Sequence, residues 1–565
     1  MRTVRHCRRA VARCGRHCLW LLLLGLSACS TYGDRQAEAI RAVERGDYEV
    51  AEARFTETLQ ERDRDYLLYL LEVGMVRHLA GDYQGSNALL QQADELRDTL
   101  PWRSGAERFG EFMTSPAQGP YRGAGYEYAY VNYFKALNFL AMAQETGDPR
   151  WLDAARVESR RLEIILNEFA ADEGDYLEQA TQEDDTASAF LRILRQLRGQ
   201  YLDPEDLIYR DDAWGRFLTG VTYENLGEWD SARVAYQQAA RAYELGYAEQ
   251  YDLGPEPARL AWASVVRMMR TGGGWEDEWP QLVEEHELDT AEIRPLTADE
   301  SLLLVLEHAG RVPPIGEMNM ILHRQPEAES LMLRPLVSRE GEEGAQQLAW
   351  FTLHYADHGL GDLLLRYQAG GVLQVLDNPL HSKQVYLGPL WEVAQEVGLL
   401  DGIGPVGVRV SVPWYPPAGP EPAASRLHLG DDRQPVRLTV MADPEQIKRQ
   451  ERLRVAQDEM MAALLRETVR NTTSSAVSGA VSNHSDEGLG LLINLLGRAA
   501  TTATARAETR HWATMPRRAR MALVRVQAEP QTLRLEQSGR TQWTREIDPV
   551  PRQVNLYLVR TFEQR

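Results

Sequence analysis

Cysteine and lysine are both scarce in this chain of 565 residues. The cysteines all lie before residue 30: Cys7, Cys14, Cys18 and Cys29. Residues 30–565 therefore lack the thiols that disulfides and zinc–thiolate sites require. The only lysines are Lys135, Lys383 and Lys448, so almost all positive charge is carried by arginine.

The first 28 residues have the composition of a secretory leader. Residues 1–18 carry six arginines and no acidic residue, and an apolar run from Leu19 to Leu26 follows. A membrane-spanning helix needs about 20 apolar residues, so this shorter run predicts a cleaved signal peptide over residues 1–28. An ordinary signal peptide with a chance cysteine, or a misplaced start codon, is the alternative interpretation.

Leu26-Ser27-Ala28-Cys29 resembles the lipobox of bacterial lipoproteins. The resemblance implies that Cys29 becomes the first residue, carries a diacylglyceryl group and is acylated at its amino end, as with palmitate. Each buried methylene contributes roughly 0.8 kcal/mol, so two or three acyl chains anchor a protein permanently. Ser30 stands where an aspartate often signals inner-membrane retention in Gram-negative bacteria. We therefore expect an outer-membrane lipoprotein that faces the periplasm.

The chain is acidic, with a formal net charge of −21 that becomes −27 when the six leader arginines are removed. Such a surface repels phosphate backbones, which disfavours nucleic-acid binding. With 44% hydrophobic residues the chain can bury substantial cores, and its length indicates two or more domains. Outside the leader, no run is long and apolar enough to predict a membrane span.

A glycine-containing pattern recurs through the first half. "GDYEVAEARFTETL" begins at Gly46, and "GDYQGSNALLQQAD" begins 35 residues later at Gly81. A looser copy begins at Gly147, and the clearest copy runs from Phe217 to Tyr243. The spacing is close to the 34-residue period of tetratricopeptide repeats. We therefore predict tetratricopeptide-like helical hairpins within residues 29–295, with a plain helical bundle as the alternative.

The clearest copy matches the tetratricopeptide pattern at six positions expected to pack two antiparallel helices. These repeat-packing residues are Gly220, Tyr223, Gly227, Ala232, Tyr236 and Ala239. Small residues allow close approach of the helices, and a glycine at the turn adopts a left-handed conformation most easily. The third copy departs from the pattern at Leu152, where a small residue is expected.

An aromatic stretch, "PYRGAGYEYAYVNYFKALNFLAMAQ", lies between the repeat copies. Tyr126, Tyr130 and Tyr133 recur at helical spacing and predict one apolar stripe. Such a stripe usually belongs to a core. The alternative is a partner-binding groove lined by Tyr121, Tyr126, Tyr130 and Tyr133, since tyrosine is enriched at interfaces.

Residues 296–565 predict a β-rich domain, and with the helical half the fold class is α+β. Val408, Val410 and Val412 alternate with polar residues, as in a half-buried strand. Similar strands are expected at 301–314, 435–443, 520–537 and 553–562, forming an antiparallel, sandwich-like sheet. Helical insertions are expected at about 321–404 and 444–510.

Patterns that indicate catalysis are missing from the sequence. There is no phosphate-binding P-loop and no G-x-S-x-G nucleophile elbow. His354 and His358 are four residues apart, but no glutamate base completes a zinc-protease pattern. We therefore expect a protein that is not an enzyme and that has no metal or cofactor site.

Five stretches together resemble an uncharacterised family of conserved bacterial lipoproteins with tetratricopeptide-like repeats. They are "PYRGAGYEYAYVNYFKALNFL", "FLTGVTYENLGEWDSARVAYQQA", "LLLVLEHAGRVPP", "VRVSVPWYPP" and "AETRHWATMP", in order from about 120 to 530. Ala124-Gly125 and Glu508 depart from the pattern. The resemblance implies a periplasmic envelope protein and supplies no catalytic residues.

Together these features predict a membrane-anchored, non-catalytic scaffold that binds other envelope proteins during envelope assembly, secretion or cell-wall synthesis. One alternative is a lipoprotein that binds or regulates peptidoglycan or polysaccharide, or a cell-wall enzyme. A homo-oligomeric structural lipoprotein is a third possibility.

Overall fold

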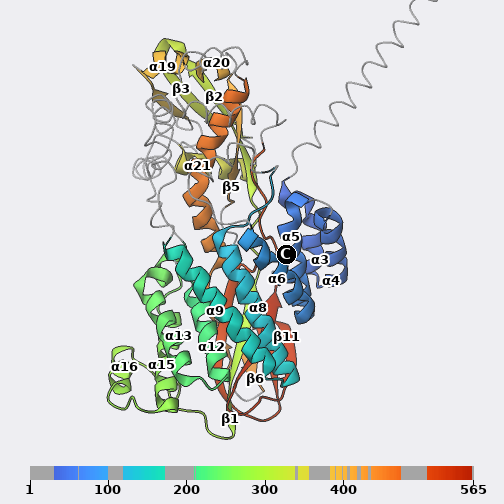
Figure 1. The fold of residues 1–565 in the computed structure, drawn as a ribbon, viewed down its shortest axis with the longest axis vertical. Coiled ribbons are helices and arrows are strands. Elements are labelled where there is room, and N and C mark those ends of the chain that lie inside the picture. Colours follow the sequence, from blue (N-terminus) through green and yellow to red (C-terminus); the bar gives the residue numbers. More distant parts are fainter. Residues whose placement is uncertain are drawn as a thin grey trace, which may run out of the picture.

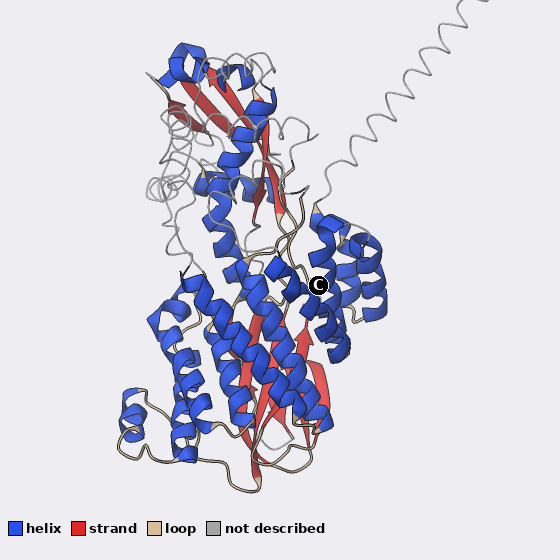
Figure 2. Ribbon diagram, viewed as in Figure 1, coloured by secondary structure: helices blue, strands red, loops and turns tan. Residues whose placement is uncertain are grey.

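The computed structural model describes most of the chain after residue 30. The described residues are 31–60, 63–99, 117, 119–171, 209, 211–337, 341–355, 382–388, 390–396, 399–403, 407–416, 421–430, 434–471 and 506–562. The predicted leader over residues 1–28, the lipidation residue Cys29 and residues 472–505 of the second expected helical insertion lie outside this set. Figures 1 and 2 show a helix-covered base with sheets behind the helices, and a second lobe above it.

Helices make up the described part of the first half. Their bounds are α2 (Tyr32–Arg35), α3 (Ala37–Glu44), α4 (Tyr48–Phe55), α5 (Tyr66–Ala80), α6 (Tyr83–Thr99), α8 (Gly125–Thr146), α9 (Arg150–Ala171), α12 (Ala213–Asn225), α13 (Trp229–Ala242), α14 (Ala248–Gln250), α15 (Glu256–Gly272) and α16 (Trp279–Glu285). None of the helices in the described ranges combines the length and hydrophobicity needed to cross a membrane.

Four pairs of consecutive helices form hairpins with the same kind of turn: α3–α4, α5–α6, α8–α9 and α12–α13. Each turn contains a left-handed glycine, with φ of 78° at Gly46, 82° at Gly81, 67° at Gly147 and 73° at Gly227. Glycine is favoured there because it has no Cβ. These are the glycines on which the repeat prediction was based, so a helical first half with hairpins at these places is confirmed. The finer tetratricopeptide assignment stays a prediction.

Two hairpins also share a close approach between their helices. A Cβ on Gly220 would lie 2.5 Å from the ring of Tyr236, and a Cβ on Gly74 would lie 2.9 Å from a methyl of Leu90. Both glycines precede the turn glycine by seven residues, and both contacted residues follow it by nine. Gly74 was not singled out from the sequence, although its distance from Gly81 repeats that of Gly220 from Gly227.

The second half builds a two-sheet sandwich in the base. The first sheet has the order β12-β1-β9-β8, and the second has the order β11-β10-β6-β7. The strands are β1 (Glu300–Ala309), β6 (Ser425–Leu429), β7 (Val436–Arg437), β8 (Thr439–Ala442), β9 (Arg518–Gln527), β10 (Gln531–Gln537), β11 (Arg540–Ile547) and β12 (Val554–Thr561). The fully antiparallel sheet expected from the sequence is corrected at one pair, because β1 and β12 run parallel with Leu302 opposite Val554.

The two faces of β1 contact two different layers. Leu302, Leu304 and Leu306 join the core of the helical half, whereas Leu303 and Val305 join the core between the two sheets. The base is thus a layer of helices on a β-sandwich, with the α8, α9 and α12 ribbons in front of the sheets in Figure 1. The change from helix to strand occurs near the expected boundary at 295/296, but one core crosses that boundary.

The upper lobe is built on a third sheet with the order β4-β3-β2-β5. Its strands are β2 (Gly316–Gln325), β3 (Ser330–Pro335), β4 (Lys383–Tyr386) and β5 (Val408–Trp414), and its described helices include α17 (Glu342–His354), α19 (Leu390–Glu396) and α20 (Leu399–Ile403). The expected helical insertion at about 321–404 is therefore corrected: besides α17, α19 and α20, half of β2 and all of β3 and β4 lie within it. Alternating Met318, Met320 and Leu322 drive β2 into the lobe's core.

Helix α21 (Pro444–Asn471) connects the lobe to the base. Ile447, near its start, belongs to the core of the base, and Met460, further along, belongs to the core of the lobe. Of the second helical insertion expected at about 444–510, α21 is present, whereas residues 506–510 are not helical.

Candidate functional site

The irregular segment 507–516, "AETRHWATMP", lies where the base, the lobe and the first helices meet, and we call it the junction segment. Trp512, Ala513 and Met515 are buried, so the backbone around them needs hydrogen-bond partners other than water. Because the segment is neither helix nor strand, several of these partners come from side chains, whereas the Met515 carbonyl accepts from the Val312 N–H at 3.1 Å. Carboxylates on the helices accept from the N–H groups of Trp512, Ala513 and Thr514.

Glu72 of α5 is the first of these carboxylates. Its Oε1 accepts from the Ala513 N–H at 2.7 Å, and its Oε2 accepts from the Thr514 N–H at 3.1 Å and the Thr514 hydroxyl at 2.6 Å. The Tyr32 hydroxyl donates to Oε1 at 3.0 Å. Burial raises the pKa of Glu72 to about 7 despite these bonds, which oppose the rise. Four donors thus converge on one buried carboxylate.

Glu127, in the first turn of α8, holds the same segment from another side. Its Oε1 accepts from the Trp512 N–H at 2.9 Å. Its Oε2 accepts from the Tyr121 hydroxyl at 2.6 Å and from the Ala124 N–H at 2.9 Å. One side chain therefore caps α8 and fixes the junction segment.

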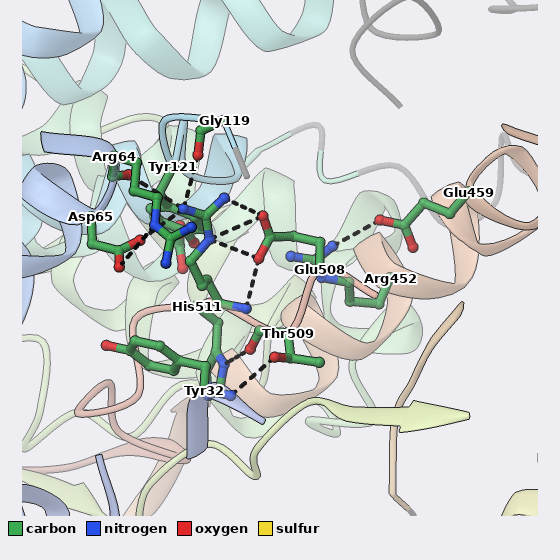
Figure 3. Close-up of polar contacts among 12 residues, drawn as sticks. Tyr32, Arg64, Asp65, Gly119, Tyr121, Arg452, Glu459, Glu508, Thr509 and His511 are labelled. Atoms are coloured by element: carbon green, nitrogen blue, oxygen red, sulfur yellow. Dashed lines mark hydrogen bonds and ion pairs between the residues drawn. The ribbon is translucent and has the colours of Figure 1, made fainter. Parts of the chain in front are cut away.

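Arg510 forms the charged part of the junction, and Figure 3 labels the residues around it, among them Asp65, Gly119, Tyr121 and Glu508. Its guanidinium donates to Asp65 Oδ1 at 2.8 Å, to Glu508 Oε1 at 2.9 Å and to the Gly119 carbonyl at 3.0 Å. It also lies 5.6 Å from the ring centroid of Tyr121. Arginine suits this site because its planar fork serves several acceptors at once.

Tyr32 brings the start of the described chain into the junction. Its backbone N–H donates to the Thr509 hydroxyl at 3.0 Å, and its ring meets that of His511 edge-on at 5.6 Å. With the bond from its hydroxyl to Glu72, three parts of Tyr32 are engaged, and the side chain is fully buried. Burial, with the nearby Lys448, lowers the pKa of His511 well below its usual value.

The first turns of α21 close the junction. Lys448 is buried, donates to the Pro313 carbonyl at 2.7 Å and lies 5.3 Å from the ring centroid of Tyr415. Arg449 lies 5.0 Å from the centroid of the same ring. Further along α21, Arg452 forms an ion pair with Glu459 at 3.2 Å (Figure 3). The lobe is thus joined to the base by aromatic and charged contacts as well as by α21 itself.

The six repeat-packing residues lie together in the α12–α13 hairpin. Tyr236 packs on Gly220 and donates from its hydroxyl to Glu224 at 2.7 Å. Ala232 and Ala239 are buried in the α13 face, and Gly227 occupies the left-handed turn. Tyr223, at the end of α12, accepts from Arg160 of α9 at 3.3 Å, which ties this hairpin to the preceding one.

The four tyrosines considered for a partner groove are all buried, from 1% to 6% exposed. Tyr121 is bound to Glu127, and the Tyr133 hydroxyl links Trp214 at 2.8 Å to His308 of β1 at 2.9 Å. Tyr126 and Tyr130 are covered as well, so this stripe is interior in the structure. Packing against the chain's own segments agrees with the core interpretation.

The carboxylates of the junction were not identified from the sequence, although one signal was present. Glu72 is the only acidic residue within the apolar helix "YLLYLLEVGMVRHLA", and Glu127 similarly interrupts an aromatic run. A lone carboxylate in such a context usually binds a specific partner, since burying an unpaired charge is costly. Two of the residues bonded to Glu72, Ala513 and Thr514, are 441 and 442 residues away, which no local pattern indicates.

The hydrogen bonds of these carboxylates are suited to fixing the junction segment in one conformation. Each junction carboxylate accepts from several donors, and among the described ranges no group of three or more histidine, cysteine or acidic side chains could hold a metal ion.

Searches against models of protein families, curated proteins and solved structures find no match to this chain.

Proposed function

We propose that this protein is a lipoprotein anchored in the outer membrane through Cys29 and facing the periplasm, where it acts as a non-catalytic scaffold for other envelope proteins. The leader, the lipobox-like Leu26-Ser27-Ala28-Cys29 and Ser30 support the anchor and its location. Tetratricopeptide-like hairpins, which commonly present binding surfaces, support the scaffold role.

The observation that carries the scaffold proposal is the repeated hairpin geometry on a base that shares one core with the hairpins. Four hairpins use the same left-handed glycine turn, and their core continues into the first sheet. Helix α9 presents Val157, 60% exposed, and Ile164, 56% exposed, two turns apart on one face. Such apolar side chains on a fixed helix are suitable contacts for a partner protein.

The test is site-specific photocrosslinking in intact cells. A photoreactive residue is placed at Val157 or Ile164, and the matched control is placed at the exposed Thr544 of β11 in the second sheet. The proposal predicts that both α9 positions capture the same protein, that Thr544 does not, and that Val157→Asp weakens the complex made through Ile164. Failure of both α9 positions to capture a protein contradicts it.

One observation favours the rival class, a peptidoglycan or polysaccharide binder. The register of the second sheet sets Arg534 opposite His428 and Glu536 opposite Arg426, which gives a polar outward face. Binding of the full chain to purified sacculi that is lost in Arg534→Ala would support this class. The full chain is needed because the isolated second half would expose the helix-facing side of the first sheet.

A further inference from the structure

The distance between the proposed anchor and the first buried residue is very short. Cys29 is separated from Tyr32 by two residues, Ser30 and Thr31. Tyr32 is completely buried and bonded to Thr509 and Glu72. Thr31 in turn caps α2, with its hydroxyl accepting from the Asp34 N–H at 3.3 Å. The folded body therefore begins at Thr31, two residues after Cys29.

Covalent geometry limits how far the body can stand from its anchor. Consecutive Cα atoms are about 3.8 Å apart, so the three steps from Cys29 to Tyr32 span at most about 11 Å. The headgroup layer of a leaflet is itself about 5–8 Å thick. With its acyl chains in the hydrocarbon core, Cys29 must lie near the inner boundary of that layer. Tyr32 and its neighbours therefore reach the headgroups or lie within a few ångströms of them.

The surface around Tyr32 can be traced from contacts. A Cβ on Gly33 would lie 3.1 Å from Pro314. The Ala507 N–H donates to Glu317 at 3.1 Å, and Arg409 lies 3.8 Å from the same carboxylate. Exposed residues on this surface are Asp34, Arg35, Pro314, Arg409 and Arg506. We call this the anchor face. Three of the five are arginines, in a chain whose overall charge is strongly negative.

We propose that the anchor face stands directly on the phosphate headgroups of the leaflet that holds Cys29, so that the side of the molecule where the lobe meets the base faces the membrane. This inference depends on the proposed lipidation. The observations that carry it are the length of chain before Tyr32, the fixation of Tyr32 and the arginines around it. Arginines near an anionic surface are attracted to it electrostatically. The consequence is a fixed orientation: partners approach from the sides of the molecule that point away from the membrane.

The experiment uses the full acylated chain in vesicles of phosphatidylethanolamine and phosphatidylglycerol. Since residues 30–565 lack cysteine, Pro314→Cys introduces a single labelling site on the anchor face. The matched control is Glu284→Cys, exposed on α16 at the lower end of the molecule, far from α3 in Figure 1. Both are labelled with a fluorophore, and quenching by headgroup-labelled lipid is measured.

The expected result is quenching at residue 314 at least several-fold stronger than at residue 284. Inserting ten Gly/Ser residues between Ser30 and Thr31, a spacer with a root-mean-square length of about 17 Å, should reduce the quenching at 314. Equal quenching at both sites, or no effect of the spacer, would overturn the orientation while leaving the anchor intact. Failure to float with vesicles, with an unmodified Cys29 by mass spectrometry, would instead overturn the lipidation and this inference with it.

Discussion

Glu127 offers the sharpest test of how the junction is held. In Glu127→Gln the side chain keeps its shape, but one carboxylate oxygen becomes an NH2 group. If the NH2 replaces Oε1, the Trp512 N–H loses its acceptor; if it replaces Oε2, the Ala124 N–H does. Either rotamer leaves one backbone donor without its acceptor, buried at Trp512 or partly buried at Ala124, and an unpaired buried donor costs about 1–3 kcal/mol.

This cost can be measured as amide hydrogen exchange, which reports local opening. A loss of about 2 kcal/mol corresponds to about 30-fold faster exchange for peptides covering residues 507–516 and the start of α8. The matched control is Glu145→Gln, an exposed residue of the same helix, which should change neither region. Unchanged exchange in both regions of Glu127→Gln would refute the view that this carboxylate fixes the junction segment.

Two further predictions concern the junction's pH dependence and the hairpin packing. Burial raises the pKa of Glu72 from 4.5 to about 7, so the fold favours the protonated carboxyl and stability should fall by up to about 3 kcal/mol as pH rises from 4.5 to 7. Exchange at the junction should therefore be faster at pH 8 than at pH 5 after correction for intrinsic rates. Glu72→Gln should remove this dependence, and greater protection at pH 8 in the native chain would contradict it. Gly220→Ala brings a Cβ to 2.5 Å from Tyr236 and should lower the free energy of unfolding by about 1–2 kcal/mol in urea melts. Gly272→Ala, with its nearest contact at 3.5 Å, should be neutral or slightly stabilising, and an equal loss in both variants would refute the close-packing argument.

The helical half was largely predictable because its signal is local. A glycine followed by an acidic residue marks each hairpin turn at Gly46, Gly81, Gly147 and Gly227, and backbone conformation alone explains why. The alternating valines of β5 were equally informative. Strands β2, β3 and β4 of the same sheet were missed, although the period of two at Met318, Met320 and Leu322 indicates a strand.

The junction was less predictable because its contacts join distant parts of the chain. "AETRHWATMP" was noted from the sequence, but its partners Glu72, Glu127 and Tyr32 lie more than 380 residues earlier. Nothing in the local pattern of 507–516 indicates an extended segment fixed by carboxylates. The tyrosine stripe shows a related limit. Periodicity places its side chains on one face of a helix, but it does not show whether that face is covered by the same chain or by a partner protein.

An acylated Cys29 is the proposed means by which this protein is held at a membrane. Mass spectrometry of the N-terminal peptide from the mature protein, purified from membranes of its own envelope, tests this most directly. We predict that the mature chain starts at Cys29 and carries a diacylglyceryl group with a further acyl chain on its amino end. An unmodified Cys29, or a mature chain starting at any other residue, would contradict it.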